Sequence, residues 1–215
     1  MLPAQRKLPL FPLNVVLFPG ATTPLHIFED RYKLMMQRCL DSDKLFGIVL
    51  IKSGKEVGEP AEPYTVGTIG SIAEYEQGND GRLFMRVIGE QRFRIGFITQ
   101  LKPYIEAEVD ILEDGPATPL TAEEYSAVHD TVLRHQRLVV GMRGGWVSDI
   151  KLPSDATELS YHLGSLAQSA MLERQQILEE SSPPARLQMG LRLLEHEIEI
   201  LKQHVANEMR KRVGG

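Results

Sequence analysis

The sequence predicts an α+β fold in which a β-rich first part with one helix precedes a bundle of helices that ends in a long helix. Up to about residue 112, apolar residues recur with the spacing of strands. Residues 113–120 (EDGPATPL) have the composition of a linker, and the apolar period beyond them is helical. We therefore expect a β-rich subdomain over residues 1–115 and a helical subdomain over residues 120–215, joined by the linker at 113–120.

Size and charge narrow the class of protein. The chain has 215 residues, of which 42% are hydrophobic and 25% charged, enough for a sizeable core. Lys and Arg number 24 against 29 Asp and Glu, and this mildly acidic balance argues against nucleic-acid binding. The single cysteine fits a reducing compartment, and no apolar run reaches the length of a membrane span. We expect a cytoplasmic protein without a signal peptide or membrane contact.

Several short strands are predicted in the first part. They cover residues 45–51, 65–75, 83–88, 92–98 and 105–111. Residues 45–51 (LFGIVLI) form a continuous apolar run, which is typical of a strand buried on both faces. Residues 77–81 (QGNDG) form a turn, and we expect Gly89-Glu90 to make a second turn. Strands at this spacing indicate a barrel or a sandwich.

One helix interrupts these strands. Its predicted apolar face comprises Phe28, Tyr32, Met35 or Met36, and Cys39. Glu29 and Asp30 lie in its first turn and Arg38 in its last turn, which suits the helix dipole. Because Cys39 falls on the apolar face, we interpret it as a buried small hydrophobic residue and not as a nucleophile.

The second part shows helix starts at several places. Thr121 and Glu124 form a capping-box pattern, and a second helix is predicted to begin at Ser154 or Asp155. A short third helix covers residues 170–179, and Pro183 opens the last one. The last helix carries a heptad stripe of Leu187, Leu191, Leu194, Ile198, Leu201 and Val205. We favour packing of this stripe inside the chain; a homodimer through the C-terminal helix is the alternative.

A search for catalytic patterns gives no enzyme class. Gly54-Lys55 lacks the residues of a P-loop, and Gly164-Ser165 lacks those of a nucleophile elbow. His129 and His135 are six residues apart and so fall on different helical faces. We expect no catalytic residue, no metal and no cofactor. An unrecognised hydrolase stays open as a third hypothesis, and its sign would be a Ser–His–Asp contact in a cleft.

Several segments resemble one known family. Residues 8–20 (LPLFPLNVVLFPG) and 24–32 (PLHIFEDRY) are similar to the opening of the N-terminal substrate-recognition domain of Lon ATP-dependent proteases. Residues 80–95, with Asp80-Gly81-Arg82 and VIGEQRFRI, match a hairpin of that domain. Further similar segments are residues 66–70, 104–109, 166–178 and 184–187, so the resemblance covers nearly the whole chain.

The resemblance implies a PUA-like pseudo-barrel followed by a bundle of about four helices, and a function in holding protein substrates. Lon proteases continue into an ATPase and a Ser-Lys protease, whereas this sequence ends at Gly215. Residues 114–117 (DGPA) are similar to the protease motif but carry Ala117 where the nucleophile would be. We therefore carry over neither ATP hydrolysis nor peptide cleavage.

The leading hypothesis is a non-enzymatic module that binds unfolded polypeptides or protein clients, with a separate protease as a further partner. RNA binding is the alternative, and it rests on the PUA-like fold alone. The candidate binding residues are His26, Glu29, Arg31 and Arg92. Each has a structural role as the competing interpretation, and for Arg92 that role is an ion pair with Glu29 or another carboxylate.

Overall fold

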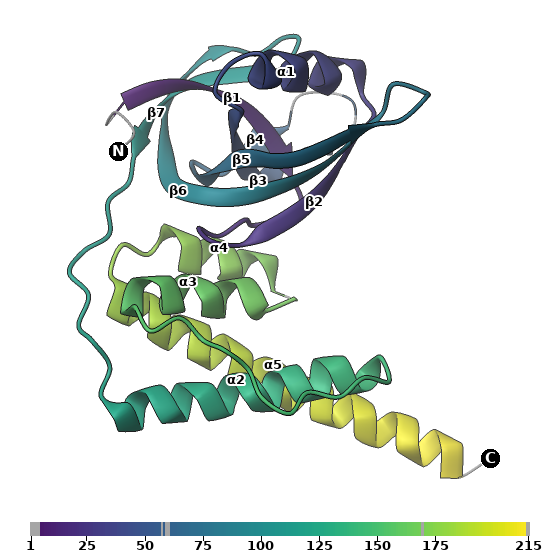
Figure 1. Cartoon of the computed structure of the whole chain (residues 1–215), viewed down its shortest axis with the longest axis vertical. Coiled ribbons are helices and arrows are strands. Elements are labelled where there is room, and N and C mark those ends of the chain that lie inside the picture. The colour runs from purple at the N-terminus through teal and green to yellow at the C-terminus, as the bar shows by residue number, and fades with distance from the viewer. Residues whose placement is uncertain (1–4, 57, 59–60, 169, 214–215) are drawn as a thin grey trace.

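The chain folds into a strand-rich part and a helical part that lie one above the other (Figure 1). The computed structural model describes residues 5–56, 58, 61–168 and 170–213. The strands occupy the first half of the chain and, with α1 aside, the helices the second half. The predicted α+β fold is confirmed.

Among the described residues, seven strands and one helix make up the sheet part. The strands are β1 (Gln5–Leu13), β2 (Thr22–Ile27), β3 (Leu45–Ser53), β4 (Glu62–Pro63), β5 (Val66–Gln77), β6 (Leu83–Gln100) and β7 (Ile105–Ile111). Helix α1 covers Asp30–Leu40. Neighbouring strands run in the order β1-β7-β6-β5-β3-β4, and β1 also pairs with β3 in parallel. This last pairing closes β1, β7, β6, β5 and β3 into a ring, which leaves β2 attached outside it to β6.

The predicted turn at Gly89-Glu90 is wrong, because β6 runs without interruption through both residues. Its first half pairs with β2 and its second half with β7. Gly89 marks the change of partner: a Cβ there would lie 2.2 Å from the carbonyl oxygen of Phe18. The glycine is therefore needed for a close backbone approach. The other predicted turn is present, and Gly81 in it has a φ of +74°.

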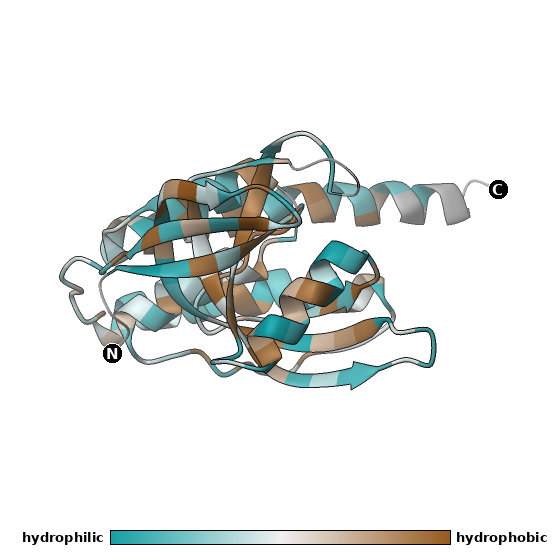
Figure 2. Ribbon diagram, turned by 90° about the horizontal axis from the view of Figure 1, so that it is seen from above, coloured by the Kyte–Doolittle hydropathy of each residue, from teal (hydrophilic) through white to brown (hydrophobic). Residues whose placement is uncertain are grey.

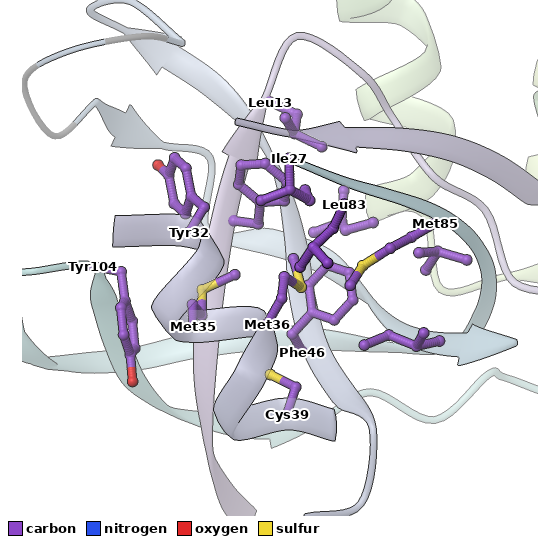
Figure 3. Packing of buried hydrophobic residues seen from close by; sticks show 14 of the residues in the cluster. Leu13, Ile27, Tyr32, Met35, Met36, Cys39, Phe46, Leu83, Met85 and Tyr104 are labelled. Atoms are coloured by element: carbon purple, nitrogen blue, oxygen red, sulfur yellow. The ribbon is translucent and has the colours of Figure 1, made fainter. Parts of the chain in front are cut away.

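Helix α1 covers the core of the sheet part. Met35, Met36 and Cys39 are buried against Phe46 and Met85 in one apolar cluster (Figure 3). Burial raises the pKa of the Cys39 thiol to about 12, so the nucleophilic thiolate is scarce. The interpretation of Cys39 as a buried hydrophobic residue is confirmed.

Phe28 departs from the predicted pattern. It was expected on the buried face of α1, but the helix begins at Asp30 and Phe28 lies before it with 46% of its surface exposed. The helical spacing from Phe28 to Tyr32 is therefore a coincidence of sequence. The consequence is an exposed aromatic side chain at the entry to the helix.

In the described part of residues 122–213, four helices form the second part. They are α2 (Ala122–Met142), α3 (Ala156–Leu166), α4 (Met171–Glu179) and α5 (Pro183–Val213). The capping box of Thr121 and Glu124 is present in full, with bonds of 2.8 and 3.2 Å. Asp155 caps α3 by accepting a bond from the Glu158 amide.

The heptad stripe of α5 packs inside the chain over its first half. Leu194 and Ile198 are buried, while Leu201 and Val205 are only partly covered where the helix extends past its neighbours. Brown apolar and teal polar residues alternate along α5 and along the strands (Figure 2). Helix α4 faces the sheet part: Arg174 donates to the Val16 carbonyl and Gln175 to the Val66 carbonyl, both at 3.0 Å.

Candidate functional site

A surface groove lies between β2 and the end of β1, and we call it the β1–β2 groove. Its volume is about 420 Å³, within the range of ligand sites. One wall is formed by the whole run of residues 23–28, and the facing wall by residues 13–15. The remaining lining residues are Phe11, Glu29, Tyr32 and Glu56. The groove therefore follows one strand along its length.

The floor of the groove is the rim of the barrel core. Leu13, Ile27 and Tyr32 lie together at one end of the buried cluster (Figure 3). The rings of Phe11 and Tyr32 meet with centroids 4.3 Å apart. An apolar side chain placed in the groove would contact residues that are already buried, so it would extend the core.

Exposed rings border the same wall. His26 stacks on Phe84 of β6, with centroids 4.6 Å apart and planes at 4°. Phe28 lies 5.7 Å from the His26 ring, and both Phe28 and Phe84 are about half exposed. Neighbouring exposed apolar side chains of this kind mark interaction sites, in contrast to scattered single ones.

Carboxylates lie at the mouth of the groove. Glu29 pairs with Arg31 at 3.1 Å and accepts a bond from the Gly58 amide. Glu56 accepts two bonds, from the main-chain and side-chain nitrogens of Asn14. Burial raises the pKa of the Tyr32 hydroxyl, and Glu29 and Glu56 add to the rise while Arg31 opposes it. The groove thus combines an apolar floor with a negative rim.

Arg92 lies elsewhere. It is buried on β6 and pairs with Asp114 at 2.7 Å, not with Glu29. Its guanidinium also donates at 2.8 Å to two carbonyls, that of Leu178 in the last turn of α4 and that of Glu180 just beyond the helix. A structural ion pair, the competing interpretation of Arg92, is what the structure shows.

A second buried arginine completes this arrangement. Arg186 of α5 donates at 2.9 Å to the same Asp114 oxygen and lies 3.7 Å from the centre of the Tyr161 ring. The Tyr161 hydroxyl also bonds to Asp114, and burial raises its pKa. We call Arg92, Asp114, Tyr161 and Arg186 the arginine cluster. It joins β6, the segment after β7, α3 and α5.

Among the described residues, the side chains of Ser165 and His135 each contact a neighbouring group. In the described ranges, no group of three or more His, Cys, Asp or Glu side chains could hold a metal ion. The Ser165 hydroxyl donates to the carbonyl of His162 at 2.7 Å, which is a bond within one helix turn. His135 pairs with Glu197 at 2.8 Å in the bundle interior.

The structure brings three of the four predicted site residues together. His26 and Glu29 line the β1–β2 groove, and Arg31 pairs with Glu29 beside it. Sequence reasoning missed Phe28, which it placed in the core, and Glu56, which carries no motif. The strand β2 itself was also missed, although a proline such as Pro24 within an extended segment is compatible with an edge strand.

Comparison with known proteins gives a family match and several relatives of this chain. The family model "ATP-dependent protease La (LON) substrate-binding domain" matches residues 7–196. Lon protease 2 of Myxococcus xanthus is 30% identical over 207 residues, which are 91% of this chain and 24% of that protein. Lon protease of Anaeromyxobacter dehalogenans is 28% identical over 91% of this chain and 24% of its own length. The chain thus spans about a quarter of the curated relatives that it matches.

Solved structures give the same picture. A Lon N-terminal domain protein from Xanthomonas campestris is 30% identical, with a TM-score of 0.67 over 87% of this chain and 98% of that one. The N-terminal domain of Lon protease from the Mycobacterium avium complex shares the fold at 16% identity, with a TM-score of 0.54 over 88% of this chain and 98% of that one. Among the described residues, no helix is both long and apolar enough to cross a membrane. By fold and by sequence over residues 7–196, the chain belongs to the family of Lon substrate-binding domains.

Proposed function

We propose that this protein is a non-enzymatic binding module whose β1–β2 groove takes segments of unfolded polypeptide. The observation that carries the proposal is a groove whose floor is made of core side chains and whose rim exposes Phe28 and the His26–Phe84 stack. Such a surface gains free energy when it covers an apolar side chain, and unfolded chains present these side chains without a fixed shape.

RNA is the weaker candidate for this groove. Aromatic rings can stack on bases, but nucleic-acid sites combine them with cationic side chains that contact phosphates. Here the charged side chains that line the groove are the carboxylates of Glu29 and Glu56. They would repel a phosphate backbone, and for this reason we place polypeptide before RNA.

The similarity supports a client-binding role and extends to the Lon substrate-binding domain only. We infer that the protein binds its clients without hydrolysing ATP or cleaving peptides, and that a separate protease is a further partner. The cytoplasm is the compartment we assign, because a buried free cysteine is stable there. Incubation of the pure protein with ATP and a labelled unfolded protein should release neither phosphate nor fragments.

The binding test compares two exposed phenylalanines. Phe28 lines the groove, whereas Phe97, also half exposed on β6, does not. The probe is a reduced and alkylated protein that cannot refold, with its native form and a single-stranded RNA as parallel arms. We expect Phe28→Ala to weaken binding of the unfolded probe about tenfold or more, the range of an aromatic hot spot. Phe97→Ala should leave it unchanged.

Two results would overturn the proposal. One is a wild-type protein that does not distinguish the unfolded probe from its native form. The other is equal loss of binding in Phe28→Ala and Phe97→Ala, which would place the site outside the groove. If the wild type binds the RNA and Phe28→Ala loses this binding, the groove is a nucleic-acid site.

A further inference from the structure

The strand that forms one wall of the groove is the edge of the sheet. Among the described residues, β2 pairs with β6 alone, along the register from Thr22–Ile88 to Ile27–Leu83. The groove runs beside β2 and is lined by every residue from 23 to 28. An edge strand offers unpaired main-chain groups to another extended segment.

The ladder fixes which main-chain groups point outward. The Gly89 amide donates to the Ala21 carbonyl, and the register continues to Ile27 without a shift. Because main-chain groups alternate in direction along an antiparallel strand, those of Thr23, Leu25 and Ile27 point to β6. Those of Thr22, Pro24 and His26 point away from it. The close His26–Phe84 stack agrees, since side chains approach most closely at non-hydrogen-bonded pairs.

The outward edge therefore presents the carbonyls of Thr22, Pro24 and His26 and the amides of Thr22 and His26. Pro24 has no amide hydrogen, and its place in the ladder is one where β6 needs none. The bonding capacity of the edge is thus uneven, with one donor missing between two that are present.

Charge restricts the occupant further. Glu56 accepts two bonds from Asn14 through one oxygen, and no cation of the described ranges lies within ion-pair distance of it. Glu29 beside it is paired with Arg31. A cationic side chain in the groove would face a half-buried carboxylate that has no countercharge among the described residues.

We propose, resting on the polypeptide-binding function above, that the β1–β2 groove receives its client as an added strand on the outward edge of β2. Alternate side chains of the client enter the groove, where an apolar one covers Leu13 and Tyr32 and a Lys or Arg pairs with Glu56. Main-chain bonds supply affinity for any extended sequence, and the two side-chain contacts supply the preference.

The first test separates the amide of His26 from its ring. His26→Ala and His26→Pro both remove the imidazole, but only His26→Pro removes the outward amide. The probe is a short acetylated and amidated peptide that alternates valine and threonine and carries one lysine. We expect His26→Pro to bind it about tenfold more weakly than His26→Ala, because one main-chain bond is lost in a partly dry site. A urea denaturation curve for each variant checks that both are folded.

The second test examines the peptide. Methylation of single backbone nitrogens should abolish binding at alternate positions only, since every second amide of an added strand points to β2. Replacing the lysine by norleucine should weaken binding to the wild type and leave binding to Glu56→Gln unchanged. Both patterns are absent if the groove holds side chains alone.

The outcomes separate this proposal from the general one. Equal affinity of His26→Pro and His26→Ala, with no alternation along the peptide, would overturn strand addition while Phe28→Ala still weakens the unfolded probe. Failure of the wild type to bind any unfolded probe would overturn both. A wild-type protein that sediments as a dimer, and becomes a monomer in His26→Pro, would show that a second copy occupies the edge and would also overturn the proposal.

Discussion

The arginine cluster and the β1–β2 groove both place aromatic rings beside charged side chains. In the cluster these groups contact one another in the interior, whereas in the groove they face solvent. In the cluster, Arg92 and Arg186 have side chains without exposed surface and share Asp114. Main-chain carbonyls accept further bonds from both guanidinium groups. Four of the six guanidinium nitrogens donate within the chain, while Nε of Arg92 and Nη2 of Arg186 are buried with no hydrogen-bond partner among the described residues. Because both guanidinium groups are buried, the cluster exposes no cation to an outside ligand.

The groove has the reverse character. Phe28 is about half exposed, Glu56 has no countercharge in the described part of the chain, and the outward edge of β2 pairs with no described strand. Buried charges destabilise the fold unless they are paired. Solvent-exposed apolar side chains and unpaired main-chain groups at a sheet edge destabilise it little, and they can bind a partner. The comparison teaches that the arginine cluster fixes the architecture and the groove is left free for binding.

The largest expected effect comes from the cluster. Asp114→Asn keeps the shape of the side chain but leaves two buried cations without a countercharge. We expect the free energy of unfolding, measured in urea, to fall by about 3 to 5 kcal/mol. Asp43→Asn, which removes the half-exposed partner of Arg6, should cost under about 1 kcal/mol. Similar losses in the two variants would contradict the assigned role of the cluster.

A smaller effect is expected one bond further out. The buried Ser160 hydroxyl accepts a 2.8 Å bond from Nε of Arg186, so Ser160→Ala leaves that donor unpaired. The expected loss is about 1 to 3 kcal/mol. Ser165→Ala on the same helix removes only a bond to its own helix turn and should cost less than about 0.5 kcal/mol. Thermal unfolding of both variants checks the difference, and the reverse order would refute it.

Acid should weaken the boundary between the two parts. Burial lowers the pKa of His162, which lines a cavity between the two parts together with the carboxylates Glu90, Asp155 and Glu158. The ordinary pKa of histidine is 6.5, so as the pH falls below 6.5 the unfolded chain protonates His162 more readily than the folded chain does. The His162 contribution is thus complete above about pH 6.5 and is lost as pH falls through the lowered pKa. The unfolding free energy of His162→Gln should depend less on pH over that interval; an unchanged slope would exclude this contribution.

The smallest stability effect is expected in the groove. Phe28→Ala removes a half-exposed ring, so the free energy of unfolding should change by less than about 0.5 kcal/mol. Urea denaturation measures it beside Phe97→Ala. A loss above 2 kcal/mol, on the scale of a core truncation, would mean that Phe28 supports the fold and is not held free for binding.

Local patterns predicted most of the fold. The apolar run at residues 45–51, the turn at Gly81 and the capping box at Thr121 all depend on neighbours in sequence, and each is present as expected. Gly89 was misinterpreted because a glycine needed for close approach to Phe18 has the same local sequence as a turn. The division into subdomains at residues 113–120 stays a prediction.

The candidate site was predictable only in part. His26 and Glu29 were found through the segment that resembles the family, which places them at the entry to a helix. Asp114 was interpreted as part of a linker, and Arg186 was noticed only within the family-like segment of residues 184–187. The two residues pair with each other across 72 residues of chain, and no local pattern encodes such a contact.

Hydrogen exchange of single amides, followed by NMR with and without the lysine-containing peptide, tests the central claim most directly. The outward amides of Thr22 and His26 should exchange at least about tenfold more slowly when the peptide is bound, because each becomes a donor to it. The amides of Tyr161 and Arg186 should not change. Protection that appears around the arginine cluster or along α5, with none at Thr22 and His26, would contradict the assignment of binding to the groove and of architecture to the cluster.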